Sequence, residues 1–327
     1  MKSTACHFSR ALGSALLLAF ATVLSQAQDL KNDSALRIAS GPAGKIYELM
    51  VRDIQAVCGA STPVRSVAST GGLQNLSILS ANESELGIVQ LDTLKDMGAG
   101  DENIRNLQAV MPLHNNLLHV LALARGSAVG TKTLGGVTVP YTGSTVVVGK
   151  FSELKGRTIA VVGSAQLMGS TLERQLRYDM QFIVADSDEH ALKLLREGSV
   201  QAVFTLGGWP LPSIVRHNIN SGLALVEYDL APQSPYLVVK RNYQNLEAFN
   251  RNFLAVPNVL MTRPFKVGGS MGTQVKTLQN CLRQHLDDFQ EGRYQAVWKE
   301  IKDTNTYYGL PAFASTNVTR ITTNSRL

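Results

Sequence analysis

The chain has 327 residues, 44% of them hydrophobic, which is enough for two domains of ordinary size that each have a core. Its formal net charge is +6, and it is +4 without residues 1–27, which contain two basic residues and no acidic one. The basic residues are scattered, without runs or interleaved aromatic residues, and this argues against a nucleic-acid partner.

Residues 1–27 have the pattern of a cleaved secretory signal peptide. Basic residues accompany an apolar run, Leu12–Leu24, and the small residues Ser25 and Ala27 occupy positions −3 and −1 of the expected cleavage site. The run is too short for a stable membrane anchor, and no other stretch reaches about 18 apolar residues. We therefore expect a soluble periplasmic protein.

The cysteines fit an exported protein. Cys6 precedes the apolar run, so it does not stand at a lipoprotein cleavage point and is removed with the signal peptide. Cys58 and Cys281 remain in an oxidising compartment, where a single disulfide is chemically allowed. Two buried free cysteines fit the sequence as well.

The first predicted unit after the signal peptide is a strand, a small-residue loop and a helix. The strand covers Leu36–Ala39, the loop is Ser40–Gly44, and apolar spacing predicts a helix from Lys45 to Val57. A P-loop is excluded, because Ala39 replaces the required glycine and Ile46 the required Ser or Thr. The loop can offer backbone N–H groups to an anion or be an ordinary turn.

A more compact unit follows at residues 64–92. A strand at Val64–Ala68 leads through Thr70-Gly71-Gly72 into a helix that ends before Asn82, and a buried strand follows at Leu86–Gln90. A βαβ unit of this kind predicts a parallel sheet, which places ligands at the carboxyl ends of its strands. Those ends are residues 70–72 and 90–92.

The middle of the chain continues with a short helix at Leu94–Ala99 and two strands, at Leu107–Leu113 and Leu117–Ala124. His114 and His119 match no metal-ligand spacing, so we predict no metal site. A β-hairpin is then predicted around a turn; it consists of the strands Val137–Tyr141 and Thr145–Val148 with Thr142-Gly143-Ser144 between them.

The second half repeats the strand–loop–helix plan. A strand at Thr158–Val162 leads into the loop Gly163–Gly169 and a helix from Ser170 to about Tyr178. The loop resembles a loose dinucleotide pattern, but no acidic residue ends a suitable second strand, so no cofactor is predicted. Trp209 follows a strand at Ala202–Leu206 and is either a core residue or a wall of a pocket.

Further strands and helices complete the expected elements. The strands are Phe182–Val184, Leu223–Val226, Tyr236–Val239 and the apolar run Phe253–Met261; the helices are Ser187–Glu197, Leu211–His217, Leu278–His285 and Tyr294–Ile301; and Phe313–Leu327 is a tail. Two crossings between domains are expected, near Ala122–Gly126 and Asn245–Val256.

Binding features are clearer than catalytic ones. The sequence contains no G-x-S-x-G, H-E-x-x-H or C-x-x-C motif, so we predict no catalytic residue and no enzyme activity. What recurs is a Gly/Ser/Thr loop at the start of a helix. Such loops hold anionic or zwitterionic ligands through backbone N–H groups and helix dipoles, each contributing about 0.3–1 kcal/mol.

Four runs together resemble one family. They are STGGLQNLSILSANESELGIVQLD, ELKGRTIAVVGSAQLMGSTLERQL, EHALKLLREGSVQAVFTLGGWPLPSIVRH and AVPNVLMTR. Their shared motifs are T-G-G-x-x-N followed by G-x-x-Q-x-D, L-K-G-R before a Gly/Ser loop, and G-x-P after a strand. The order and spacing are similar to those of the TAXI family of TRAP-transporter solute-binding proteins over most of Leu36–Ile301.

The resemblance implies an α/β, two-lobed periplasmic binding protein with a hinge of two crossover segments. Lobe 1 would comprise 34–122 plus 250–312, lobe 2 would comprise 123–249, and 313–327 would be a flexible tail. The implied ligand-binding residues are Ser40, Gly44, Thr70, Gly71, Asn75, Gln90, Asp92, Ser164, Ser170, Thr171, Gly208 and Pro210, to which we add Trp209.

The implied function is capture of a small carboxylate, such as a dicarboxylate, or an amino acid by lobe closure, and delivery to a TRAP-type membrane permease by a monomer. Departures from the family surround the pocket: the first loop reads Gly44-Lys45-Ile46-Tyr47 where Gly-x-Tyr-Tyr is usual, and its S-G-T loop is stretched to SAQLMGST. A receptor for a membrane sensor kinase and a secreted enzyme are the alternatives.

Overall fold

The computed structural model describes residues 34–128, 131–134, 137–140, 145–266 and 268–313. The predicted signal peptide and nearly all of the predicted tail therefore lie outside the described residues. Within the described ranges, none of the helices is both long and apolar enough to cross a membrane.

The first group of elements, which we call the first lobe, is built from parallel strands and the helices that follow them. Its strands are β1 (Leu36–Gly41), β2 (Val64–Ala68) and β3 (Leu86–Gln90), and its helices are α2 (Ile46–Cys58), α3 (Gly72–Ser80), α4 (Leu91–Gly98), α5 (Glu102–Arg105), α9 (Ser270–Gln284) and α10 (Leu286–Gln290), with the 3-10 helix η4 (Ala296–Glu300).

The second group, the second lobe, repeats this plan. Its strands are β9 (Thr158–Val162), β10 (Gln181–Ala185), β11 (Ala202–Gly207) and β12 (Leu223–Leu225), and its helices are α6 (Ala165–Leu176), α7 (Asp188–Arg196) and α8 (Pro212–Val215), with 3-10 helices η1 (Phe151–Leu154), η2 (Ile219–Ser221) and η3 (Gln244–Leu246). Short strands β5 (Ser127–Ala128), β6 (Thr131–Leu134), β7 (Val137–Pro140) and β8 (Thr145–Val146) lie beside it.

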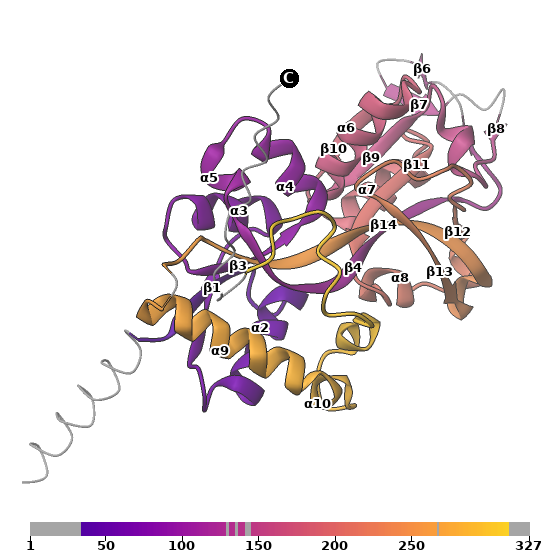
Figure 1. The fold of residues 1–327 in the computed structure, drawn as a ribbon. Helices are drawn as coiled ribbons and strands as arrows, with labels where there is room; N and C mark the ends of the chain where they lie inside the picture. The colour runs from indigo at the N-terminus through magenta and orange to yellow at the C-terminus, as the bar shows by residue number, and fades with distance from the viewer. Residues whose placement is uncertain (1–33, 129–130, 135–136, 141–144, 267, 314–327) are drawn as a thin grey trace, which may run out of the picture.

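Two long antiparallel strands, β4 (Gln108–Leu123) and β14 (Ala248–Thr262), run through both lobes (Figure 1). They join ten of the described strands into one sheet of order β10-β9-β11-β4-β14-β3-β1-β2, with β12 on β4 and β13 (Leu237–Tyr243) on β14; β5 with β8 and β6 with β7 form two separate two-stranded sheets. The predicted α/β class with two lobes and two crossover segments is therefore confirmed by the sheet topology.

The long strands change partners at the centre of the sheet. β4 begins to pair with β11 at Leu117, and β14 leaves β13 at Ala255 and pairs with β3 from Asn258. The change of partners in β4 lies a few residues before the crossing expected near Ala122–Gly126, and that in β14 lies at the end of the one expected near Asn245–Val256. Continuous backbone pairing between β4 and β14 across this point makes the two strands the physical connection between the lobes.

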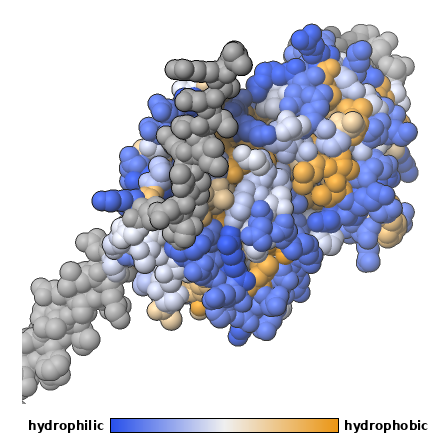
Figure 2. All heavy atoms as spheres, in the orientation of Figure 1, coloured by the Kyte–Doolittle hydropathy of each residue, from blue (hydrophilic) through white to orange (hydrophobic). Residues whose placement is uncertain are grey.

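Helices cover both faces of the sheet. Apolar residues of α3, α4, α5 and α6 share one hydrophobic cluster that extends over both lobes. On the other face, α2, α9 and α10 pack on the first lobe, and α7 and α8 pack on the second. Figure 2 shows hydrophilic residues over most of the visible surface, with hydrophobic residues in scattered patches, so the apolar runs of the sequence lie largely inside these clusters.

Local sequence explains where several elements begin. The Ser187 hydroxyl accepts a hydrogen bond from the His190 N–H (3.1 Å) and caps α7, whose first turn is acidic and whose last turn is basic. Before α3, Gly71 has φ +128° and ψ −162°, a conformation essentially restricted to glycine, which lets the chain turn sharply from β2 into the helix.

β4 is one strand of 16 residues where the sequence predicted two. The prediction broke the run at the polar residues His114, Asn115 and Asn116. The chain stays extended through them because His114 and Asn116 are buried in a polar cluster with hydrogen-bond partners from other elements. Buried polar residues that are paired do not interrupt a strand.

The hairpin predicted around Thr142-Gly143-Ser144 is wrong, and the turn itself lies outside the described residues. β7 pairs with β6, and β8 pairs with β5, so the two predicted strands have different partners. The sequence held a shorter-range signal, because Gly135-Gly136 stands between the two runs that pair.

α6 begins at Ala165, not at Ser170, so most of the predicted loop is the start of a helix. Ala165, Gln166, Leu167 and Met168 are strong helix formers. Gly169 is favoured in the helix because a Cβ there would lie 3.1 Å from the Phe182 ring. At the other end of the chain, the helix predicted over Tyr294–Ile301 is the shorter η4.

The disulfide alternative is confirmed. Cys58, at the end of α2, is bonded to Cys281 of α9 with a Cα–Cα distance of 5.9 Å. Both cysteines are buried, at 0% and 8% exposure. The bond therefore joins two helices on one face of the first lobe and does not cross to the second.

Candidate functional site

The carboxyl ends of parallel strands from both lobes meet where the long strands change partners. Gln90, the last residue of β3, pairs with Asn258 of β14, and Gly207, the last residue of β11, pairs with Leu117 of β4. Because Leu117 also pairs with Ala255, three residues from Asn258, the two strand ends lie on either side of one central region. Ligands of open α/β sheets bind at this kind of edge.

A buried polar cluster occupies this region, and we call Tyr47, Gln90, His114, Asn116 and Asn258 the crossing cluster. The Tyr47 hydroxyl donates a hydrogen bond to Asn258 Oδ1 (2.7 Å) and accepts one from Asn116 Nδ2 (2.8 Å). Asn258 Nδ2 donates to the His114 carbonyl (2.9 Å). α2 thus supplies a side chain that ties both long strands together beside the end of β3.

Several polar atoms of the crossing cluster have no hydrogen-bond partner among the described residues. They are Gln90 Nε2, His114 Nδ1 and Asn116 Oδ1, on side chains whose residues are 2%, 0% and 5% exposed. The His114 and Asn116 side chains interact with each other, which acts to raise the pKa of His114, so the Gln90 amide is the one with no partner of either kind among the described residues. An unpaired buried polar group costs about 1–3 kcal/mol, so native proteins keep few of them without a reason. Burial lowers the pKa of His114 to about 4, and the imidazole is therefore neutral at neutral pH.

Asp92 lies next to this cluster, in the first turn of α4. It is 4% exposed, and its carboxylate accepts hydrogen bonds from the Thr93 N–H (2.7 Å) and the Tyr236 hydroxyl (3.3 Å). Burial raises the pKa of Asp92. Burial raises the pKa of Tyr236 and of Tyr47, and the negative charge of Asp92 raises both further. Asp92 therefore lies near Tyr47 of the crossing cluster.

The two lobes contact each other along α4. Arg174 Nη2 of α6 lies 2.8 Å from Asp96 Oδ1, with side chains 58% and 43% exposed. Lys95 Nζ donates a hydrogen bond to the Ser234 hydroxyl (2.8 Å), just before β13. With the bond from Tyr236 to Asp92, these contacts hold α4 of the first lobe against the second.

The residues predicted from the first lobe divide into buried and exposed positions. Ser40 is buried, and its hydroxyl lies 2.6 Å from that of Ser66. Gly44 is exposed, has φ +71°, and its N–H donates to Glu48 Oε2 (3.0 Å). Thr70 is exposed, and its N–H donates to Gln74 Oε1 (2.7 Å). The N–H groups of Gly44 and Thr70 thus have partners within the chain.

The Asn75 side chain forms hydrogen bonds with other residues of the first lobe. It is 0% exposed; its Oδ1 accepts from the Ser69 hydroxyl, and its Nδ2 donates to the Ile88 carbonyl (2.8 Å). The side chain therefore fixes α3 and the preceding loop, including Gly71, to β3. Hydrogen bonds of this kind support the start of α3 from within the protein.

The predicted second-lobe residues come from the β9–α6 connection. Ser164 is exposed at the start of α6, and Ser170 and Thr171 lie inside the helix and are partly exposed. Thr171 Oγ1 accepts a hydrogen bond from Arg174 Nη2 (3.0 Å), so it lies beside the contact between α6 and α4.

Gly208 and Trp209 follow β11 and lie near the crossing. A Cβ at Gly208 would be 2.9 Å from Val297 Cγ1 and 3.3 Å from His114 Cδ2, so a larger residue does not fit there without a shift. The Arg241 guanidinium lies 5.2 Å from the centroid of the Trp209 ring. Pro210 is exposed and is joined to Trp209 by a cis peptide bond.

Sequence reasoning missed five members of this region: Tyr47, His114, Asn116, Asn258 and Tyr236. One signal was present, because His114-Asn115-Asn116 and Asn258 interrupt two long apolar runs that otherwise read as buried strands. Polar residues inside such runs need partners or a function.

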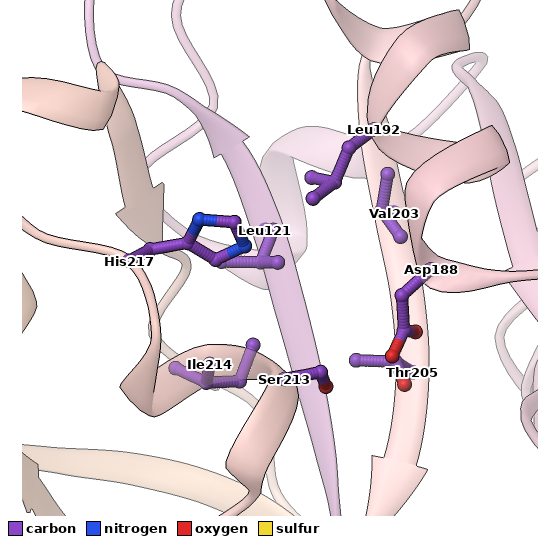
Figure 3. A pocket seen from close by; sticks show the side chains of 8 residues that line it. All are labelled: Leu121, Asp188, Leu192, Val203, Thr205, Ser213, Ile214 and His217. Carbon is purple, nitrogen blue, oxygen red and sulfur yellow. The ribbon is translucent and has the colours of Figure 1, made fainter.

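A hollow elsewhere in the second lobe does not offer a better site. Figure 3 shows it among α7, α8, β4 and β11, and it is too narrow to admit a water molecule. Asp188, Ser213 and His217 line it, but each has a buried atom without a hydrogen bond, and they do not form a hydrogen-bonded relay. No group of three or more His, Cys, Asp or Glu residues in the described ranges is placed to hold a metal ion.

Comparisons with known proteins give no family. No protein-family model matches the chain, and a search of curated proteins found no match. Solved structures that match include the GluR0 ligand-binding core in complex with L-glutamate, the amino acid ABC transporter substrate-binding protein AbpA from Streptococcus pneumoniae bound to L-arginine, and an ancestral arginine-binding protein bound to arginine.

These three structures are 13%, 12% and 12% identical in sequence to this chain. They cover 80%, 84% and 83% of this chain and 97%, 98% and 99% of their own, with TM-scores of 0.46, 0.48 and 0.47. Identities and TM-scores this low leave the ligand of the present chain open.

Proposed function

We propose that this protein is a periplasmic solute-binding receptor that captures a small carboxylate or amino acid between its lobes and delivers it to a TRAP-type permease. The observation that carries the proposal is the crossing cluster, whose unpaired buried polar atoms lie where strand ends of both lobes meet. The proposed lobes are 34–122 plus 250–312 and 123–249.

The connection between the lobes suits a hinge. Among the residues that the structure describes, β4 and β14 run as extended backbone from one lobe to the other at the crossing, and both strands change partners there. Small changes in a few backbone dihedral angles at such a point rotate one packed lobe against the other.

Two of the polar contacts along α4 are exposed and weak, and they stand beside a hydrophobic cluster that extends over both lobes. An exposed ion pair such as Arg174–Asp96 contributes about 0–1 kcal/mol. The hydrogen bond from Lys95 to Ser234 is also exposed. A ligand that contacts both lobes only when they are closed therefore supplies the difference in affinity that shifts the population.

The compartment and the partner rest on sequence features. The disulfide between Cys58 and Cys281 suits an oxidising compartment, as the predicted signal peptide does. Assignment to the TAXI family, and hence to a TRAP-type permease, rests on the T-G-G-x-x-N, Q-x-D and G-x-P motifs. Permease genes beside this gene would support it, whereas a sensor-kinase gene would support the signalling alternative.

The test is native mass spectrometry of freshly purified protein, followed by thermal-shift measurements with carboxylates and amino acids. We expect a bound small molecule, and stabilisation of about 2.7 kcal/mol at a hundredfold excess over Kd. A flat melting temperature across the whole panel, with no copurified ligand, would contradict the proposal. Chemical turnover of a bound compound would instead support the alternative that the protein is a secreted enzyme.

Two buried glutamines offer matched variants. Gln90 Nε2 has no hydrogen-bond partner among the described residues, whereas Gln279 Nε2 donates to the Val110 carbonyl (2.8 Å) on the far side of the first lobe. Gln90→Leu should weaken ligand binding by about tenfold or more and leave the ligand-free stability nearly unchanged. Gln279→Leu should leave ligand binding nearly unchanged and lower the ligand-free stability, because it leaves the Val110 carbonyl without its partner.

A further inference from the structure

The carboxylate of Asp92 is buried without a cationic partner. None of the ion pairs among the described residues includes it, although it is 4% exposed. The two cations on neighbouring elements have other contacts, since Arg174 pairs with Asp96 and Lys95 donates to Ser234. The hydrogen bonds to Asp92 come from neutral groups, which include the N–H and the hydroxyl of Thr93 and the hydroxyl of Tyr236.

Such a carboxylate is unfavourable unless something compensates it. Burying a charge is costly, and proteins usually pair a buried carboxylate with a cation or with a metal. No described cluster of His, Cys, Asp or Glu completes a metal site around Asp92. Burial raises its pKa, which agrees with a carboxylate that lacks a positive partner.

The surroundings of Asp92 can bind the rest of a small ligand. Gln90, two residues earlier, has a buried donor at Nε2 without a hydrogen-bond partner among the described residues, and the Asn116 amide oxygen lies in the same cluster beside His114. Both residues are more than nine-tenths buried and belong to the crossing cluster. Asp92 lies near the same cluster, since its negative charge contributes to the raised pKa of Tyr47. A carboxylate acceptor beside an amide donor matches a molecule that carries both an ammonium and a carboxylate group.

We infer that Asp92 receives the ammonium group of the ligand, so that the solute is an amino acid and not a carboxylate without nitrogen. The inference rests on the proposed receptor function and narrows its ligand class. Tyr236, from the second lobe, contacts the same carboxylate (3.3 Å), so an ammonium bound there lies at the contact between the lobes. The Asp92 carboxylate then takes part both in binding the ligand and in the contact between the closed lobes.

The first test compares pairs of compounds that differ only in the amino group. Calorimetric titration would use L-glutamate with glutarate, L-leucine with 4-methylpentanoate, and L-arginine with 5-guanidinopentanoate. In the pair that binds, the amino acid should bind at least about tenfold more tightly, because its ammonium forms a charge-assisted hydrogen bond. Equal or tighter binding of the compound that lacks the amino group would overturn the inference and leave the receptor function standing.

The second test uses Asp92→Asn with Asp96→Asn as the matched control one turn further along α4. Asp92→Asn should lower the affinity for the bound amino acid by about tenfold to hundredfold. It should also raise the melting temperature of the ligand-free protein, because it removes an unpaired buried charge. Asp96→Asn, whose side chain is 43% exposed, should change both quantities little.

A purely structural role of Asp92 gives a different pattern. The melting temperature of Asp92→Asn would then fall while its affinity stayed within about threefold of the wild type, and this result would overturn the inference. Stabilisation of the wild type by sodium or potassium chloride that is lost in Asp92→Asn would assign the site to an inorganic cation and would also overturn it. Absence of binding by every compound would contradict the receptor function itself.

Discussion

Removal of the disulfide should destabilise the first lobe without affecting ligand binding. The bond closes a loop between residues 223 apart in sequence. The chain-entropy relation gives about 5 kcal/mol for a loop of that length, and native disulfides typically contribute about 2–4 kcal/mol. Cys58→Ala combined with Cys281→Ala avoids a leftover thiol, and we expect it to lower the free energy of unfolding by about 2–5 kcal/mol.

The measurement is urea unfolding followed by circular dichroism, with and without a reducing agent. The reduced wild type should resemble the double variant, and the variant itself should not respond to the reductant. Because Cys58 is the last residue of α2, whereas Tyr47 of the crossing cluster is in its first turn, ligand affinity should stay within about threefold. A loss of stability below about 1 kcal/mol, or a large loss of affinity, would refute this reasoning.

Three further predictions concern buried polar side chains. Tyr47→Phe removes a hydroxyl that makes two hydrogen bonds in the crossing cluster, so chemical denaturation should show a loss of about 1–3 kcal/mol, and an unchanged midpoint would contradict the cluster. Asn75→Ala should lower ligand-free stability by about 1–3 kcal/mol with little effect on affinity; the opposite pattern would restore Asn75 as a ligand contact. Burial lowers the pKa of His114 to about 4 and of His119 to about 3, below the ordinary value of 6.5. As the pH falls, both imidazoles are therefore protonated in the unfolded chain at a higher pH than in the folded protein. Stability from the neutral imidazoles is therefore full above about pH 6.5 and is lost as the pH falls towards 3, by on the order of 3 kcal/mol for His114 and about 5 kcal/mol for His119. NMR titration should find both imidazoles neutral at about pH 5.5 in the folded protein, and protonation there would refute the assignment.

Much of the fold could be predicted because its strands are short, apolar and bounded by clear signals. β2, β3 and β9 have the predicted bounds, and the order of strands and helices predicted the two-lobed α/β class. The errors arose where local pattern and tertiary context disagree. β4 continues through His114-Asn115-Asn116 because partners distant in sequence satisfy the polar side chains, and no local pattern reports such partners.

The candidate site was predicted less completely than the fold. Motif spacing pointed to Gln90 and Asp92, which lie at the centre, since strand ends can be located from the sequence. It could not separate Asn75, whose amide is used within the protein, from a ligand contact, because this depends on the Ser69 and Ile88 positions in space. Tyr236 reaches Asp92 across 144 residues of sequence, a separation that a local pattern does not cover.

The central claim is that a ligand closes the lobes about β4 and β14, and a distance between the lobes tests it most directly. Spin labels at Glu102→Cys of α5 and Glu197→Cys after α7 would stand on exposed positions of the first and second lobes. With the ligand identified by mass spectrometry, pulsed electron resonance should show a longer, broader distance distribution without ligand and a shorter, narrower one with it. A single distribution that does not change on saturation with that ligand would contradict closure as the mechanism of capture.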